Sequence, residues 1–206
     1  MTIRATHLRT RIASGLVAAP LLAALLVPRA ASAEPVTFDL DPTHTTIAFF
    51  VDHIGYARTL GWFTEVSGSF VYNAKEQTVS DIRVEVNPAS VFTNDERRDE
   101  HVRNSDFLDV ENHATVVFTA DGGEVTGETT GMIPGELTLL GETRPIEVKV
   151  TLNKDAPYPF GHEKRTVGVS AEAVVTRSEF GMDYALGGIV GDDVTVIIEL
   201  EAIARD

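Results

Sequence analysis

Residues 166–175 read Thr-Val-Gly-Val-Ser-Ala-Glu-Ala-Val-Val, with an apolar residue at every second position from Val167 to Val175. This period of two is typical of a β-strand that buries one face and exposes the other. An amphipathic helix would instead need apolar residues three and four positions apart. The stretch therefore predicts a half-buried strand, and it is the clearest of several such stretches in the chain.

The same alternation recurs in residues 82–86, 146–152 and 194–202. Less regular strands are expected at residues 37–41, 45–52, 63–72, 115–120, 124–130 and 135–140. Turn-forming residues separate these segments, and few intervening stretches are long enough for a helical crossover. The pattern predicts an all-β protein with an antiparallel sheet, either closed into a barrel or folded into a sandwich.

One segment, residues 94–104, breaks the alternation. Thr93-Asn94-Asp95-Glu96 matches a capping box, which marks the start of a helix. Between residues 95 and 104 the only strongly apolar residue is Val102. We therefore expect a short helix on the surface or across an opening, because it lacks an apolar face for the core.

The first 33 residues have the parts of a cleavable secretion signal. Basic residues with no acidic partner come first, residues 15–27 are then mainly apolar, and Ala-Ser-Ala ends at Ala33. The apolar run contains Pro20 and is shorter than the roughly 20 residues that span a bilayer. We expect export, cleavage near Ala33–Glu34, no stable membrane anchor, and one domain over residues 34–206.

The composition excludes several classes of protein. The chain has 31 Asp and Glu against 17 Lys and Arg, a formal net charge of −14, so nucleic acid is not an expected partner. It has no Cys, which excludes disulfides, thiol catalysis and cysteine-based metal sites. Core burial must therefore stabilise the fold without covalent help.

No catalytic or nucleotide-binding motif is present. The histidines of residues 44–162 do not have metal-ligand spacings, so we expect no metal, no cofactor and no enzyme. A metal-assisted hydrolase is a less favoured alternative, and it would require His44, His53 and His101 to converge.

The aromatic residues leave two interpretations open. They could fill the core of a β-sandwich, which would suit a stress-response or interaction protein without a ligand. They could equally line a barrel, whose concave apolar interior would surround a small molecule.

Six ordered motifs resemble those of the YceI-like polyisoprenoid-binding family. They lie at residues 41–49 (DPTHTTIAF), 61–70 (GWFTEVSGSF), 98–107 (RDEHVRNSDF), 135–146 (GELTLLGETRPI), 177–182 (RSEFGM) and 191–194 (GDDV). The likeness covers nearly all of residues 36–204. Departures from the family pattern are modest; Leu140, for example, stands where His is common.

The resemblance implies an extended, lipocalin-like antiparallel barrel of about eight strands, in the periplasm or outside the cell. It also implies that the barrel sequesters or carries an isoprenoid lipid, such as a quinone or a polyprenyl phosphate, without catalysis. A homodimer that covers the opening is a further hypothesis.

Three groups of residues are candidates for such a site. The alternating faces predict a cavity wall of Phe49, Val51, Phe70, Val84, Phe118, Leu137, Leu139, Val148, Val169 and Val196. Three aromatic residues near strand ends and the helix are expected at the cavity mouth: Trp62, Phe92 and Phe107. A polar cluster of His44, Arg98, Asp99 and His101 would either hold a lipid head group or attach the helix to the barrel.

Overall fold

The computed structural model describes residues 34–205, so the expected signal, residues 1–33, lies outside the described residues. The described chain consists mainly of antiparallel strands, with one α-helix, α1 (Glu96–Arg103), and two short 3-10 helices, η1 (Pro88–Ser90) and η2 (Arg177–Phe180). Within residues 34–205, no helix has the length and apolar character needed to cross a membrane.

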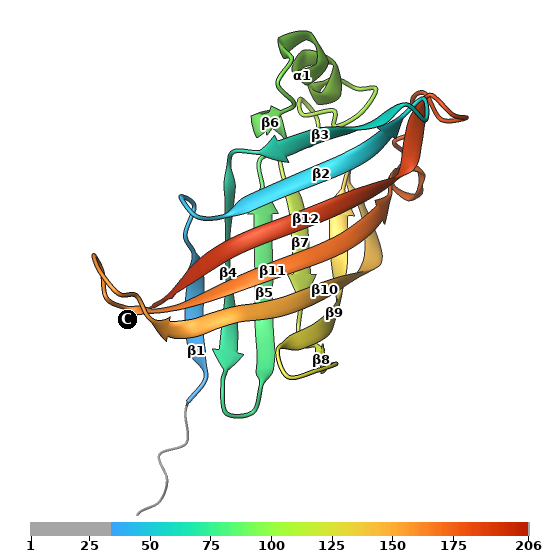
Figure 1. The fold of residues 1–206 in the computed structure, drawn as a ribbon. Helices are drawn as coiled ribbons and strands as arrows, with labels where there is room; N and C mark the ends of the chain where they lie inside the picture. Colours follow the sequence, from blue (N-terminus) through green and yellow to red (C-terminus); the bar gives the residue numbers. More distant parts are fainter. Residues whose placement is uncertain (1–33, 206) are drawn as a thin grey trace, which may run out of the picture. The chain divides into compact units, whose positions relative to one another are not determined.

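The described strands form one sheet, and every pairing between them is antiparallel (Figure 1). They are β1 (Val36–Leu40), β2 (Thr46–His53), β3 (Ala57–Phe63), β4 (Val66–Asn73), β5 (Thr78–Val86), β6 (Val91–Phe92), β7 (Val116–Ala120), β8 (Glu124–Val125), β9 (Thr130–Leu139), β10 (Glu142–Pro157), β11 (Arg165–Thr176) and β12 (Val190–Ala204).

These strands form a closed barrel of eight, because some pairs of consecutive strands together make one bent barrel strand. β1 and β2 both pair with β12, β3 pairs with β2 and β6, and β4 pairs with β1 and β5. The pairs β1–β2, β3–β4 and β5–β6 are thus three barrel strands, each interrupted by a bend. The pairing of β1 with β12 closes the ring, so the predicted antiparallel barrel is confirmed and the sandwich alternative is wrong.

The alternation of apolar residues decides which face of each strand points inward. In β11, Val167, Ala171 and Ala173 are buried, whereas Glu172 and Val174 are exposed. The fully buried side chains Phe38 and Ala202 belong to a core cluster shared by β1, β2, β4, β5, β11 and β12. A second cluster lies near α1 and includes Val91, Leu108, Phe180 and Met182. Burial of these apolar faces stabilises a barrel that has no disulfide.

Two expectations about strands need correction. Residues 57–62, which were not expected to be a strand, form β3 together with Phe63, and the strand expected over residues 63–72 begins at Val66 as β4. Arg58 and Thr59 interrupt the apolar pattern of β3, but its backbone pairs with β2 throughout. Residues 124–130, expected to be one strand, contain only the two-residue β8 and the start of β9. The segment between them is a turn closed by the Thr126 N–H bond to the Thr130 carbonyl, at 2.9 Å.

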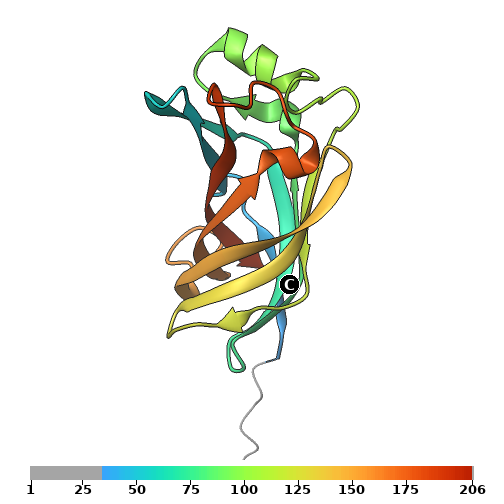
Figure 2. The same ribbon diagram turned by 90° about the vertical axis from the view of Figure 1, so that its right-hand side faces the viewer.

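The short helix is confirmed, but its cap differs from the prediction. Asp95 is the N-cap residue, and its carboxylate accepts the Arg98 N–H at 2.9 Å. Thr93 precedes the helix and donates its hydroxyl to Asp99 instead, at 2.6 Å. In both ribbon views α1 lies beyond one end of the barrel, which brings its polar side chains close to that opening (Figures 1 and 2).

Candidate functional site

A cavity of about 700 Å³ runs through the barrel. All ten residues predicted for its wall do line it, and they come from β2, β4, β5, β7, β9, β10, β11 and β12. Alternation places them there because every second side chain of a barrel strand points inward. Sequence reasoning missed further apolar lining residues on the same faces: Ile133, Ile146, Val150, Leu152, Val194, Ile198 and Leu200.

Ionisable side chains of the lining lie towards the two ends of the cavity. Glu124 and Glu128 lie in and after β8, which Figure 1 shows at the end away from α1. Arg98, His101 and Arg177 belong to α1 and η2, and Asp52 and His53 at the end of β2 line the cavity near Gly191, to which Arg177 donates. The middle is apolar, so it can remove hydrocarbon from water but offers no polar partner to a ligand there.

The predicted mouth residues separate into two groups. Phe107 lines the cavity and contacts the rings of His101 and Tyr184 edge-on, at 5.1 and 5.3 Å. Trp62 and Phe92 do not line the cavity; they pair across β3 and β6 with ring centroids 4.7 Å apart. Their placement at the mouth is wrong, because both point to the outer face of these strands.

The predicted polar cluster is not a single cluster. His44 lies at the bend between β1 and β2, where its partners are Asp41 and Thr43. Arg98, Asp99 and His101 lie on α1. Sequence distance could not reveal this separation, because the bend lies within a barrel strand formed by β1 and β2, whereas α1 lies beyond the end of the barrel.

Arg98 and Asp99 hold one residue, Thr93, from two sides. The buried Asp99 carboxylate accepts the Thr93 N–H at 2.7 Å and its hydroxyl at 2.6 Å. The Arg98 guanidinium donates to the Thr93 hydroxyl oxygen at 2.8 Å and to its carbonyl at 2.6 Å. These bonds attach the start of α1 to the chain leaving β6. For Arg98 and Asp99 they match the second of the two expected roles, which was to attach the helix to the barrel.

His101 has different partners. Its Nε2 lies 2.9 Å from an oxygen of Asp106, and its ring contacts Phe107 and Tyr184. Because His101 also lines the cavity, it is a polar group that a ligand in the α1 end of the cavity can reach.

Arg177 is the functional candidate that sequence reasoning did not single out. Its buried guanidinium donates to the carbonyls of Met182, Gly191 and Val190, at 2.6, 2.8 and 3.1 Å. Burial lowers the pKa of Arg177 from its usual value, while Asp192 and Asp183 oppose that shift. Arg177 therefore fixes both ends of the loop 182–191; the signal available in the sequence was its position as the first residue of the motif at residues 177–182, directly after an apolar strand.

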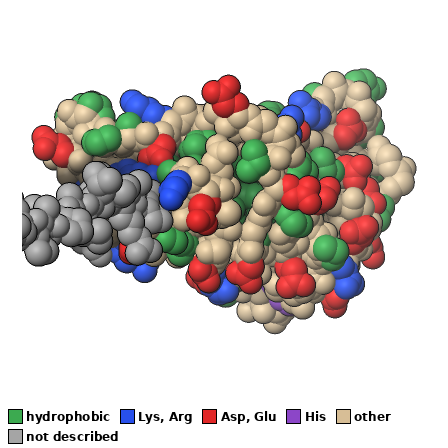
Figure 3. Space-filling view, turned by 90° about the horizontal axis from the view of Figure 1, so that it is seen from below, with side chains coloured by type: hydrophobic (Ala, Val, Ile, Leu, Met, Phe, Trp, Pro, Cys, Tyr) green, Lys and Arg blue, Asp and Glu red, His purple; other side chains and the backbone are tan. Residues whose placement is uncertain are grey.

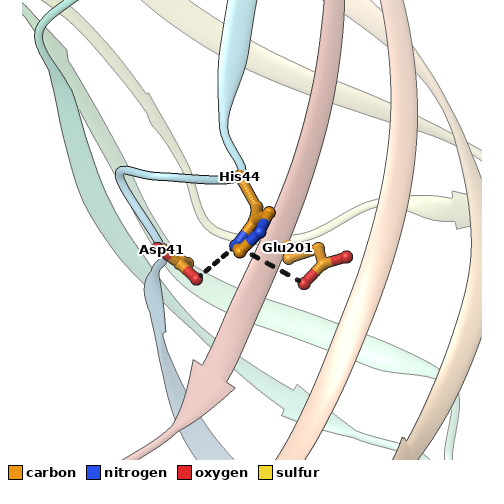
Figure 4. Close-up of side chains that lie close together, drawn as sticks. All are labelled: Asp41, His44 and Glu201. Atoms are coloured by element: carbon orange, nitrogen blue, oxygen red, sulfur yellow. Dashed lines mark hydrogen bonds and ion pairs between the residues drawn. The ribbon is translucent and has the colours of Figure 1, made fainter. Parts of the chain in front are cut away.

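The bend between β1 and β2 holds a compact group of ionisable residues (Figure 4). His44 Nδ1 lies 2.8 Å from Asp41 Oδ2 and 4.0 Å from Glu201 Oε2. Burial raises the pKa of Asp41, but hydrogen bonds from His44 and Thr43 outweigh it and lower the pKa to about 2. The bond to Asp41 raises the pKa of His44 despite some desolvation. These shifts favour an Asp⁻–His⁺ pair that fastens the bend.

One donor atom from each of these three residues lies within 4.8 Å of the others, a spacing that a metal ion could bridge. Hydrogen bonds within the bend already account for Asp41 and His44, because Asp41 accepts from Thr43 and pairs with His44. The hydrolase alternative required His44, His53 and His101 to converge. His53 and His101 line the cavity, but His44 does not, so these three do not form one site.

Comparison with known proteins places the chain in a family. The profile of the YceI-like domain matches residues 38–202. A UPF0312 protein of Shewanella baltica is 34% identical over 172 residues, which cover 84% of this chain and 89% of that protein. A UPF0312 protein of Pseudomonas savastanoi is 34% identical over 167 residues, covering 81% of this chain and 86% of that protein.

Solved structures share the fold. Burkholderia cenocepacia BcnA superposes with a TM-score of 0.71 at 17% identity, covering 79% of this chain and 98% of that one. A polyisoprenoid-binding domain from Saccharophagus degradans has a TM-score of 0.63 at 14% identity and covers 82% and 99% of the two chains. The barrel geometry, the ordered motifs and the match over residues 38–202 together show that this chain belongs to the YceI-like family.

Proposed function

We propose that this barrel binds one isoprenoid lipid chain in its cavity, as an exported protein that sequesters or carries the lipid without chemical change. The observation that carries the proposal is the cavity itself, about 700 Å³ in volume and lined along its middle by apolar side chains. This volume lies within the ~300–1,000 Å³ range of small-molecule sites. The neighbour from Saccharophagus degradans, described as polyisoprenoid-binding, supports the class of ligand.

The physical basis of binding is burial of hydrocarbon. Each CH₂ group removed from water contributes about 0.8 kcal/mol, so a few isoprene units suffice for tight binding without polar contacts in the middle of the cavity. A long apolar wall also fits a chain better than a compact ring system. We propose a quinone or a polyprenyl phosphate as the specific ligand. Its head group would lie at an end of the cavity, where the ionisable side chains are.

The α1 end is the better candidate for the head group. His101 and Arg177 line the cavity there, together with Arg98, whereas Glu124 and Glu128 lie towards the other end. An anionic head group is attracted to Arg98 and Arg177, which outnumber Asp52, the one lining carboxylate at that end, and it is repelled by Glu124 and Glu128. Export through the signal at residues 1–33 would place the carrier in an aqueous compartment, where a free isoprenoid chain is insoluble.

A cavity-filling variant tests the proposal. Val169→Trp adds a large side chain to the middle of the cavity, and Glu172→Trp adds the same side chain to the exposed face of β11 as a matched control. The purified proteins are extracted with solvent and analysed by mass spectrometry, then titrated with a polyprenol and a quinone in detergent. We expect wild type and Glu172→Trp to bind, and Val169→Trp to lose at least tenfold in affinity.

The opposite results would reject the function. Failure of wild type to bind either lipid, or equal binding by Val169→Trp and Glu172→Trp, would show that the cavity is not a lipid site. Circular dichroism and thermal melting of both Trp variants show whether the barrel is intact.

A further inference from the structure

Four exposed apolar side chains surround the cavity opening between the β2–β3 turn and the loop before β12. We call Ile54, Tyr56, Tyr184 and Ile189 the mouth rim. Tyr56 is 91% exposed, Ile189 53%, Ile54 49% and Tyr184 46%, so the rim presents apolar surface to solvent. Isolated exposed apolar residues are ordinary, but a group on adjacent loops indicates a binding surface.

The two loops are joined to each other. The Ile54 N–H bonds to the Ile189 carbonyl at 2.9 Å, and His53 pairs with Val190 in the sheet. Figures 1 and 2 both show the β2–β3 tip beside the loop that leads into β12. The rim is therefore one surface carried by two segments that are distant in sequence.

The rim is continuous with the cavity. Tyr184 and Ile189 line the cavity and are also exposed to solvent. Arg177 fixes the loop that carries both, through the carbonyls of Met182 and Val190. A hydrocarbon chain that leaves the cavity at this point meets apolar side chains before it meets water.

Backbone strain at Ile54 is a second, independent observation. Ile54 has φ 55° and Gly55 has φ 69°, within a turn closed by the Tyr56 N–H bond to the His53 carbonyl at 3.1 Å. Tight hairpin turns with positive φ at both central residues favour Asn-Gly. A β-branched side chain in the left-handed region is a genuine outlier. Because Ile54 is half exposed, burial of its side chain does not explain why Ile rather than Asn occupies this position. Backbone strain of this kind is characteristic of functional surfaces.

From these observations we propose that the mouth rim docks on the surface of an electrically neutral phospholipid bilayer, so that lipid passes between membrane and cavity without crossing water. This inference rests on the proposed lipid-binding function. Tyr suits the interface because its ring is apolar and its hydroxyl stays hydrated, and Ile54 can insert at the tip of the hairpin.

Charge favours a neutral bilayer over a second copy of the chain. The formal net charge of −14 opposes the association of two copies; Figure 3 shows that acidic side chains are also spread over the end of the barrel away from α1 and the rim. The same charge repels anionic lipid. Docking on a neutral bilayer through apolar contacts avoids the repulsion between two copies and the repulsion from anionic lipid. The affinity for such a bilayer should therefore be insensitive to salt.

Vesicle flotation tests the inference. Purified protein is floated with phosphatidylcholine vesicles and with vesicles that contain phosphatidylglycerol, as wild type and as the double variant Ile54→Asn/Tyr56→Ser. Neither substituted residue lines the cavity. Phe160→Ser is the matched control, because Phe160 is an exposed aromatic residue in the β10–β11 turn, on the opposite side from the β2–β3 tip in Figure 1.

We expect wild type and Phe160→Ser to float with phosphatidylcholine and the rim variant to bind at least tenfold less. Phosphatidylglycerol should weaken wild-type binding. The rate of lipid uptake from vesicles should fall in the rim variant in proportion, whereas its binding of lipid presented in detergent should match wild type.

Three results would overturn the inference: equal flotation of wild type and rim variant, stronger binding to anionic vesicles, or a wild-type dimer in sedimentation analysis that the rim variant loses. The detergent titration keeps the two proposals separate. If wild type floats but binds no lipid in detergent, the proposed function fails; if it binds lipid in detergent but does not float, only the docking fails.

Discussion

Two hairpin turns of this barrel have the same local geometry and opposite surroundings. Ile54-Gly55 joins β2 to β3 with φ values of 55° and 69°, and Leu140-Gly141 joins β9 to β10 with φ values of 52° and 78°. Each places a large apolar residue in a left-handed conformation, where L-residues are strained by about 1–2 kcal/mol. Leu140 packs against the core cluster near α1, whereas Ile54 is half exposed.

The difference shows how to distinguish structural strain from functional strain. At Leu140 the burial of the side chain offsets the unfavourable backbone, so the turn contributes to folding. At Ile54 no comparable burial exists, although the same backbone position would accept Asn at lower cost. The exposed turn lies at the cavity mouth, which is why we assign it a role outside folding.

The largest expected effect comes from removing the residue that holds the loop beside Ile54. Arg177→Met leaves three carbonyls around a buried site without their donor, so we expect a loss of about 3 kcal/mol in the free energy of unfolding. Urea unfolding measures it. Arg144→Met is the control, since Arg144 is exposed and should lose less than about 1 kcal/mol. Equal losses in the two variants would refute the role given to Arg177.

A smaller loss is expected at the buried turn. Leu140→Asn removes apolar burial worth about 2 kcal/mol and relieves part of the strain, for a net destabilisation of about 1 kcal/mol. Thermal melting and urea unfolding should both show it. A gain in stability would mean that packing of Leu140 does not offset its backbone conformation.

The exposed turn should respond in the opposite direction. Ile54→Asn supplies the favoured Asn-Gly pair and removes little burial, so we expect a stabilisation of about 0.5–1 kcal/mol. The same unfolding measurements apply, with Leu140→Asn as the counterpart. A loss of stability in both variants would show that packing offsets the backbone strain at Ile54 as it does at Leu140.

The bend between β1 and β2 differs from both turns, because an ion pair between Asp41 and His44 stabilises it. The pKa of Asp41 is lowered from 3.8 to about 2, so its contribution to stability is present above pH 3.8 and is lost as the pH falls towards 2. The pKa of His44 is raised above 6.5, so its contribution is present below pH 6.5 and is lost as the pH rises through the raised value.

We therefore expect the stability difference between wild type and Asp41→Asn/His44→Gln to be largest near pH 5.5 and smaller at pH 2 and pH 9. Urea unfolding at the three values measures it. A difference that does not vary with pH would show that the bend is held by the backbone bonds between residues 41 and 201 and between residues 201 and 44 rather than by the ion pair.

Some residues of the candidate site could be predicted from the sequence and others could not. Val169 and Val196 could be placed in the cavity from sequence, because the two-residue period of a strand fixes the face on which a side chain lies. Trp62 and Phe92 were misplaced because an aromatic residue near a strand end carries no signal about which face it joins. His44 was grouped wrongly with α1, since its hydrogen-bond partners Asp41 and Thr43 lie in its own bend, and the further carboxylate 4.0 Å away, Glu201, is brought near by the pairing of β1 with β12.

The sequence by itself determined the antiparallel strands, the surface helix and the apolar inner face, because these depend on local periodicity and on the composition of each segment. Only the tertiary structure decided that three bent strands close a barrel of eight, that Arg177 holds the loop before β12, and that Ile54 and Ile189 form one rim. Those features depend on hydrogen bonds and packing between distant segments, and local periodicity does not encode which segments meet.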